Sequence, residues 1–447
     1  MSFEVCFLVI LCNFAPFQSM DIQSLQALYA KHKQVKALSK ALEKDSVKTI
    51  FAEGLCASAA PLVFSGMAQN APQVLSSPFV FILDDAEEAG YFYHDLAQIL
   101  GESQVLFFPS SFRRAIKFGQ RDAANEILRT EVVSRLTAGS RPLFVVTYPE
   151  AVIEKVVSKD VLEEQTLKLH DGEKVDILFV EETLYTLGFK RVDYVYEPGQ
   201  YAVRGSILDV FSYSSEYPFR IDFFGDEVDS IRTFEVQSQL SKEKQKEVII
   251  VPELTTTKNN KVPFLDFLPS NAVLVLKDLS FLHDVADKVY HDGFSAQAMV
   301  VEQAESEMHE AELRESLHAE MMLVNGSTLM KGLLNFRRIE IGHRPSGKAQ
   351  ATVHFSLSPQ PIFHKNFELL SQTLSENLLR GYTLYILADS EKQTDRLTAI
   401  FQEQGTGIVF TPINKTLHSG FTDDDLKVCL FTDHQIFDRL SQVQSEK

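Results

Sequence analysis

Short apolar strands alternate with helical stretches over the first third of the sequence. Strand-forming runs occur at 47–52 (VKTIFA), 79–83 (FVFIL), 105–108 (VLFF) and 143–147 (LFVVT), with helical stretches between them. Runs without polar interruption indicate strands that are buried on both faces, which is typical of a parallel sheet covered by helices. The sequence therefore predicts an α/β fold with a parallel sheet at its centre.

The pattern changes after about Thr166 to strands in which apolar and polar residues alternate. The runs RVDYVY, YAVRGSILDVF and PFRIDFFGDEVDSIRTFE carry this alternation, and Gly225-Asp226 stands where a two-residue hairpin turn is expected. Alternation with tight turns indicates an antiparallel sheet that has one solvated face. We therefore expect a separate α+β domain at 166–250.

Later segments add a second α/β pattern. From 251 to 354 the pattern is mixed, and from 355 to 447 helices at 367–379 and 392–404 alternate with apolar strands. We expect a further small α/β domain over 355–447. Near the start of the chain, apolar residues at helical spacing predict one amphipathic helix from Ile22 to Leu42.

Charge and cysteine content limit the function classes. The net charge of -18 and the pI near 5.2 argue against a broad nucleic-acid-binding surface, because such a surface needs clustered lysine and arginine. Four scattered cysteines favour neither a disulfide framework nor a zinc site, which fits a cytoplasmic protein. Residues 1–19 are expected to be an N-terminal extension ahead of Met20, and no run elsewhere reaches the length of a membrane helix.

The loop after the first strand stands in the position of a phosphate-binding loop but lacks its chemistry. It reads GLCASAAP from Gly54 to Pro61, against GxxxxGK[ST] in nucleotide-binding proteins. Ala59 replaces the second glycine, Ala60 the lysine that reaches the phosphates, and Pro61 the hydroxyl that holds magnesium. Each loss disables a separate part of phosphoryl transfer, so we expect no catalytic residue, no bound metal and no ATP or magnesium in this chain.

One antiparallel strand carries an aromatic residue among polar ones. Alternation over 219–224 puts Phe224 on the same face as Arg220 and Asp222, where water is expected. Arginine and aromatic side chains dominate interface energetics, which makes Arg220 and Phe224 candidate anchors for a protein partner. Packing of Phe224 against a neighbouring domain of the same chain is the alternative.

A basic set consists of Arg113, Arg114, Lys117 and Arg121. It could contact phosphate, but no interleaved aromatic residues accompany it. Solvation or contact with a protein is the alternative, and the sequence leaves open whether this set binds anything.

The stretch from Gly188 to Gln239 resembles the signature that the excision-repair protein UvrB shares with the bacterial transcription-repair coupling factors (Mfd). The stretch IKFGQRDAANEILRTEV at 116–132 is more similar to the coupling factors, and the altered loop agrees, because UvrB keeps its lysine. The resemblance covers about 20–447. It implies a degenerate RecA-like domain related to P-loop NTPases, in two parts at 20–165 and 251–354, with the UvrA-binding α+β domain at 166–250 and the small α/β domain at 355–447.

The resemblance also implies a non-catalytic docking role, in which the chain recruits UvrA to stalled RNA polymerase. By motif, the UvrA-contacting positions fall on Arg204 in YAVRG and on Arg220 and Phe224 in FRIDFF. Contacts with RNA polymerase and DNA are expected through an RNA-polymerase-interaction domain and an ATP-driven translocase that lie beyond this chain. Two alternatives remain: a UvrB-type ATP-dependent enzyme that processes damaged DNA, and a structural fragment without a partner of its own.

Overall fold

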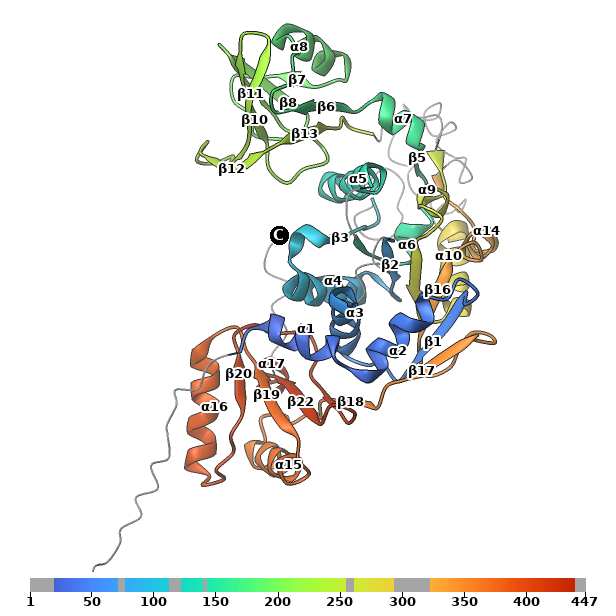
Figure 1. The fold of residues 1–447 in the computed structure, drawn as a ribbon, viewed down its shortest axis with the longest axis vertical. Helices are drawn as coiled ribbons and strands as arrows, with labels where there is room; N and C mark the ends of the chain where they lie inside the picture. The colour runs from blue at the N-terminus through green and yellow to red at the C-terminus, as the bar shows by residue number, and fades with distance from the viewer. Residues whose placement is uncertain are drawn as a thin grey trace, which may run out of the picture.

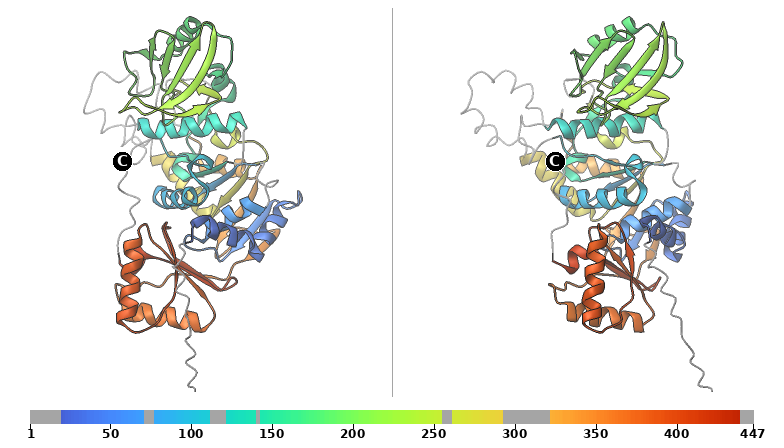
Figure 2. Two further views of the ribbon diagram at one scale, coloured as in Figure 1. Left: turned by 60° about the vertical axis from the view of Figure 1, so that its left-hand side comes forward. Right: turned by 90° about the vertical axis from the view of Figure 1, so that its left-hand side faces the viewer.

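Three units are stacked along the long axis of the molecule (Figure 1). The computed structural model describes residues 20–70, 77–111, 122–139, 143–254, 261–292 and 322–438. A parallel sheet with its helices forms the central unit, a sheet that is antiparallel except for the β7–β8 pair forms the inserted unit at one end, and a mixed sheet forms the C-terminal unit at the other. Both turned views in Figure 2 show the same stacking.

Seven strands, all paired in parallel, form the sheet of the central unit. From edge to edge they are β17 (Ala351–His354), β1 (Thr49–Glu53), β16 (Arg337–Gly342), β15 (Val273–Leu276), β2 (Phe79–Ile82), β4 (Phe144–Thr147) and β3 (Val105–Phe107). The residues of β2, β4 and β15 are all buried, as expected for strands with a helical layer on each face.

Helices cover the two faces of this sheet (Figure 1). On one face lie α1 (Ile22–Ala30), α2 (Lys33–Leu42), α3 (Ala59–Asn70) and α4 (Ala86–Leu100). On the other lie α6 (Pro149–Val152), α9 (Phe264–Phe267), α10 (Leu279–Asp292) and α14 (Gly326–Leu333), while α5 (Ala123–Ala138) packs beside β3. Among the described residues, no helix combines the length and apolar character that a bilayer span requires.

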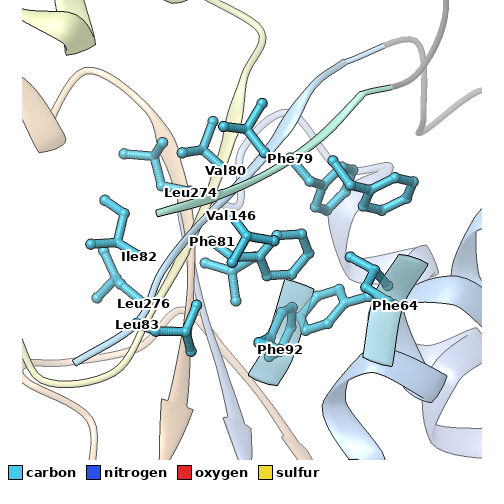
Figure 3. Close-up of a cluster of buried hydrophobic side chains, with 14 of the residues drawn as sticks. Phe64, Phe79, Val80, Phe81, Ile82, Leu83, Phe92, Val146, Leu274 and Leu276 are labelled. Atoms are coloured by element: carbon cyan, nitrogen blue, oxygen red, sulfur yellow. The ribbon is translucent and has the colours of Figure 1, made fainter. Parts of the chain in front are cut away.

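Phenylalanine side chains join β2 to the helices above it (Figure 3). The Phe81 ring centroid lies 4.9 Å from that of Phe64 on α3 and 4.8 Å from that of Phe92 on α4. Phe79 stacks on Phe144 of the neighbouring strand at 5.8 Å. Alternate residues of the same strand, Val80 among them, point to the opposite face, so the strand is apolar on both sides.

Two short ladders flank the junction between the inserted unit and the central unit. They pair β6 (Leu167–His170) with β13 (Glu247–Ile250) and β5 (Val156–Val157) with β14 (Lys261–Val262). The six-stranded sheet runs in the order β12 (Ser241–Gln245), β11 (Glu227–Phe234), β10 (Phe219–Phe224), β9 (Ile207–Val210), β8 (Gln200–Arg204) and β7 (Lys190–Arg191). Helix α8 (Ile177–Thr186) packs on one face of this sheet, and α7 (Lys159–Glu164) precedes β6.

A five-stranded mixed sheet forms the C-terminal unit, and helices flank it. Its strands run in the order β18 (Leu357–Pro359), β21 (Phe421–Asp423), β22 (Val428–Thr432), β19 (Thr383–Leu387) and β20 (Thr411–Ile413). Its helices are α15 (Phe367–Leu379), α16 (Glu391–Glu403) and α17 (Asp433–Ile436).

These three sheets confirm the predicted α/β class with an inserted antiparallel sheet and a further small α/β sheet. Residues 1–19 and the basic set Arg113, Arg114, Lys117 and Arg121 lie outside the described residues. The prediction of one helix from Ile22 to Leu42 is wrong, because the chain breaks between α1 and α2.

A buried histidine explains that break. His32 caps α2, with its Nδ1 accepting a hydrogen bond from the Gln34 N–H at 2.9 Å. Its Nε2 lies 3.4 Å from Oδ2 of Asp423 on β21, and the Tyr29 hydroxyl donates to the same oxygen at 2.8 Å. The break between the helices thus lets the N-terminal segment contact the C-terminal unit through a buried polar group.

Asp423 is fully buried, yet it is stabilised as a carboxylate. Burial by itself would raise the pKa of Asp423, but hydrogen bonds from His32, the Leu426 N–H and Tyr29 outweigh it, and the pKa is lowered. The ionised side chain therefore stabilises the folded state.

We expect Asp423→Asn to make the free energy of unfolding depend less on pH in the acid range. A carboxyl whose pKa is lowered by folding contributes stability above its unfolded pKa, near 3.9, and loses it as pH falls through the folded pKa. Urea unfolding between about pH 6 and pH 2 should therefore show a steeper loss for the native chain than for the variant. Asp425→Asn, at an exposed neighbour, is the control, and equal slopes for all three proteins would contradict the assignment.

Candidate functional site

Strand β10 of the inserted unit has one buried and one polar face. Ile221 and Phe223 are buried against α8, in a cluster with Val180 and Leu184. The alternate positions Arg220, Asp222 and Phe224 lie on the opposite face, as the alternation predicts.

Phe224 ends β10 and is 82% exposed. It pairs with Glu227 across the turn at Gly225-Asp226, where Gly225 has a φ of 62°. The predicted two-residue turn is therefore present. With most of its surface in water, Phe224 is not packed against a neighbouring unit of the chain.

A buried carboxylate organises the polar face beside it. Asp209 on β9 has no exposed surface and lies opposite Arg220 in the sheet. The Arg220 guanidinium donates from Nε to Oδ1 at 2.8 Å and from Nη2 to Oδ2 at 2.9 Å, and Nη2 of Arg204 also donates to Oδ2. One carboxylate thus brings together the two arginines that the sequence singled out.

Aromatic rings and main-chain oxygens hold the arginines in place. Arg204 lies over the Tyr194 ring at 5.0 Å and donates to the Asp193 carbonyl at 2.9 Å. Arg220 lies over the Phe234 ring at 4.5 Å and donates to the Gln239 carbonyl at 3.1 Å.

The two arginines differ in access to a partner. The Arg220 side chain is only 16% exposed, and its hydrogen bonds to Asp209 raise its pKa, so its charge is fixed. The Arg204 side chain is 35% exposed. Partner contacts by Arg204, Arg220 and Phe224 stay predictions, but their accessibility decreases from Phe224 to Arg204 to Arg220.

Sequence reasoning missed Asp209 and Tyr194. A signal was present: Asp209 is an acidic residue inside the otherwise apolar run ILDVF, and such a residue needs a buried cationic partner. The register that places it opposite Arg220 came only with the structure.

The altered phosphate loop connects β1 to α3. Gly54 has a φ of 84°, and a Cβ atom there would lie 2.3 Å from the Phe355 carbonyl oxygen, so only glycine fits. Ala59, Ala60 and Pro61 are buried in the first turn of α3. Their small or apolar side chains pack inward and present no cation or hydroxyl.

A cavity of about 380 Å³ lies beside this loop. The described residues that line it include the carboxylates Asp85, Glu87, Glu88 and Asp95, but no lysine or arginine. Lys277 forms ion pairs with Glu88 and Asp84, which compensates part of this negative charge. The remaining carboxylates would repel a phosphate group placed here.

One group of side chains has the composition of a metal site. His32, Asp423 and Asp425 bring potential ligand atoms within 4.8 Å of one another. Because Nδ1 of His32 accepts the Gln34 N–H, the ring proton belongs on Nε2, which faces Asp423. A proton on Nε2 leaves no lone pair there for a metal ion, so the 3.4 Å contact with Asp423 fits a structural role better than a metal site.

Comparison with known proteins gives consistent matches. Residues 167–255 match a family model described as the UvrB interaction domain. A transcription-repair-coupling factor of Bacillus subtilis is 21% identical over 476 aligned positions, which cover 88% of this chain and 40% of the relative.

Shorter alignments reach higher identity. The transcription-repair-coupling factor of Myxococcus xanthus is 31% identical over 184 positions, covering 40% of this chain and 15% of the relative. The transcription-repair-coupling factor of Escherichia coli is 36% identical over 101 positions, which cover 23% of this chain and 9% of the relative. The chain spans about 40% of the length of the Bacillus subtilis relative.

We expect Asp209→Asn to destabilise the inserted unit by about 2–3 kcal/mol, because the largely buried Arg220 guanidinium loses its counter-charge and the partly exposed Arg204 guanidinium loses its charged partner. Asp222→Asn is the matched control on the same face, since its partner Arg232 is 40% exposed and such pairs contribute about 1 kcal/mol or less. Urea unfolding followed by circular dichroism measures both. Equal losses for the two variants would contradict the role of Asp209.

Proposed function

Because this chain is homologous to the N-terminal region of the transcription-repair-coupling factors, we propose that it is the docking module through which such a factor recruits UvrA to stalled RNA polymerase. The observation that carries the proposal is Phe224, an aromatic side chain held in water at the tip of the β10–β11 hairpin. The matched family model, which covers this hairpin, supports it.

The surface around Phe224 has the composition of an interface hot spot. Phe224 can fill an apolar pocket on a partner, and Arg204 can contact a carboxylate at its rim. A guanidinium has five N–H donors, and the hydrogen bonds of Arg204 to Asp209 and to the Asp193 carbonyl use two of them. The partner surface should therefore be apolar at the centre and acidic beside it.

Arg220 contributes differently in this proposal. Its guanidinium is committed to Asp209 and to the Gln239 carbonyl. Arg220 therefore acts as a positioning residue that holds the Asp209 side chain beneath Arg204. Pre-organisation of this kind lowers the entropy cost of binding.

The module works by binding rather than by catalysis in this proposal. The altered loop offers no cation to a phosphate, and the adjacent cavity is lined by carboxylates. Contacts with RNA polymerase and with DNA are assigned to the parts of the longer relatives that this chain does not span. The net charge of -18 also disfavours broad DNA contact.

We expect Phe224→Ala to weaken UvrA binding by about tenfold or more, because loss of a central aromatic anchor costs about 1–2 kcal/mol or more. Titration calorimetry with purified UvrA measures the effect. Tyr185→Ala is the matched control, since Tyr185 is 76% exposed but lies on α8, on the other side of the sheet. Equal weakening by both variants, or no binding by the native chain, would sink the proposal.

We expect no saturable binding of a fluorescent ATP analogue at up to about millimolar concentration, with or without magnesium, since the loop lacks the lysine and hydroxyl that hold phosphate and metal. ATP turnover should equal the buffer background. Saturable binding or turnover would instead favour the UvrB-type enzyme. A protein with an intact phosphate loop, measured in parallel, shows that the assay detects binding.

A further inference from the structure

A segment of the C-terminal unit lies against the altered phosphate loop. Ser58, which directly precedes α3, donates its main-chain N–H to the Ser419 carbonyl at 3.2 Å. In return the Ser419 N–H donates to Oγ of Ser58 at 2.8 Å. In nucleotide-binding loops the N–H groups before this helix point at phosphate oxygens, so here a peptide oxygen takes that role.

The loop is contacted at its first residue as well. The Phe355 carbonyl oxygen approaches Gly54 so closely that no side chain fits, and the Phe355 N–H donates to the Glu53 carbonyl at 2.9 Å. Two segments far apart in the sequence, near 355 and 419, therefore close over the two ends of one loop. Ser58 is 2% exposed as a result.

The polarity of the contact suits a peptide and not a phosphate. The His418 N–H donates to Oδ1 of Asp95 on α4 at 2.7 Å. The His418 ring stacks on Tyr91 with centroids 3.5 Å apart, and burial lowers the pKa of His418 despite the Asp95 charge, which favours the neutral ring. The acidic cavity thus receives N–H donors and a neutral ring, whereas a phosphate would bring further negative charge.

The contacting segment is fixed within its own unit. The Gly420 N–H donates to Oε1 of Gln435 at 2.7 Å, and its carbonyl accepts from the Gln360 N–H at 2.9 Å. A Cβ atom at Gly420 would lie 2.7 Å from the Leu430 carbonyl oxygen, a main-chain atom, so this position also requires glycine. Leu417 and Phe421, on either side, are buried in the core of the central unit.

We propose that the altered phosphate loop is now the binding surface for the C-terminal unit. Residues 416–420 occupy the position of a bound phosphate and fix that unit to the parallel sheet. Ala59, Ala60 and Pro61 stand where a phosphate loop has its nucleotide-binding residues. Their presence and the Ser58–Ser419 contact are then two aspects of one change. The two units move as one body, while the inserted unit is attached separately at the junction that the two ladders flank.

Hydrogen exchange measured on the whole chain tests this contact between the loop and residues 416–420. The double variant Ser58→Ala/Asp95→Ala removes the acceptors of the Ser419 and His418 N–H groups. We expect exchange to rise by about tenfold or more in the segments 54–64 and 414–422 together, because buried donors without acceptors favour opening. Exchange in 219–234 of the inserted unit should stay as in the native chain.

Ser419→Ala is the matched control, because both contacts of Ser419 use its main chain. It should leave exchange unchanged. If the double variant unfolds and exchange rises everywhere, the single variants Ser58→Ala and Asp95→Ala should give a smaller rise confined to the same two segments. A rise in only one segment, or native exchange in the double variant, overturns the proposal.

Discussion

The structure depends on one constraint: a charged or polar group that leaves water must find a partner inside the protein. Three buried carboxylates of the described chain meet it. Asp209 joins strands β8, β9 and β10 through two arginines, Asp423 joins the N-terminal helices to the C-terminal unit, and Asp95 holds the segment at His418. Asp209 acts within the inserted unit, whereas Asp423 and Asp95 each accept hydrogen bonds from a different unit.

Much of the fold follows from sequence patterns, because periodicity reports burial directly. Uninterrupted apolar runs predicted the parallel strands, and the turn at Gly225-Asp226 set the register that exposes Phe224. The break at His32 was not predictable from helical spacing, since the side chain that causes it contacts Asp423, almost 400 residues later. The role of Asp209 was not predictable for the same reason, because its partners come from two other strands.

The two candidate sites illustrate opposite relations between motif and structure. At the altered loop, residue identities alone predicted the loss of phosphate-binding chemistry, but they gave no sign of what contacts the loop instead. At the β10 surface, the motif identified Arg204, Arg220 and Phe224 as equal candidates. Their exposure then separated them, because Phe224 is open to a partner and Arg220 is mostly buried. Sequence identifies which groups are present at a site, and packing decides which of them water or a partner can reach.

The paired strands β6 and β13 have a mechanical consequence. The chain enters the inserted unit through β6 and leaves it through β13, and Leu169 and Val248 of these strands lie in the apolar core of that unit. One antiparallel ladder therefore holds together the two places where the backbone passes between the units. A pull on the inserted unit is shared by two covalent backbones, and neither crossing can separate from the other without breaking that ladder.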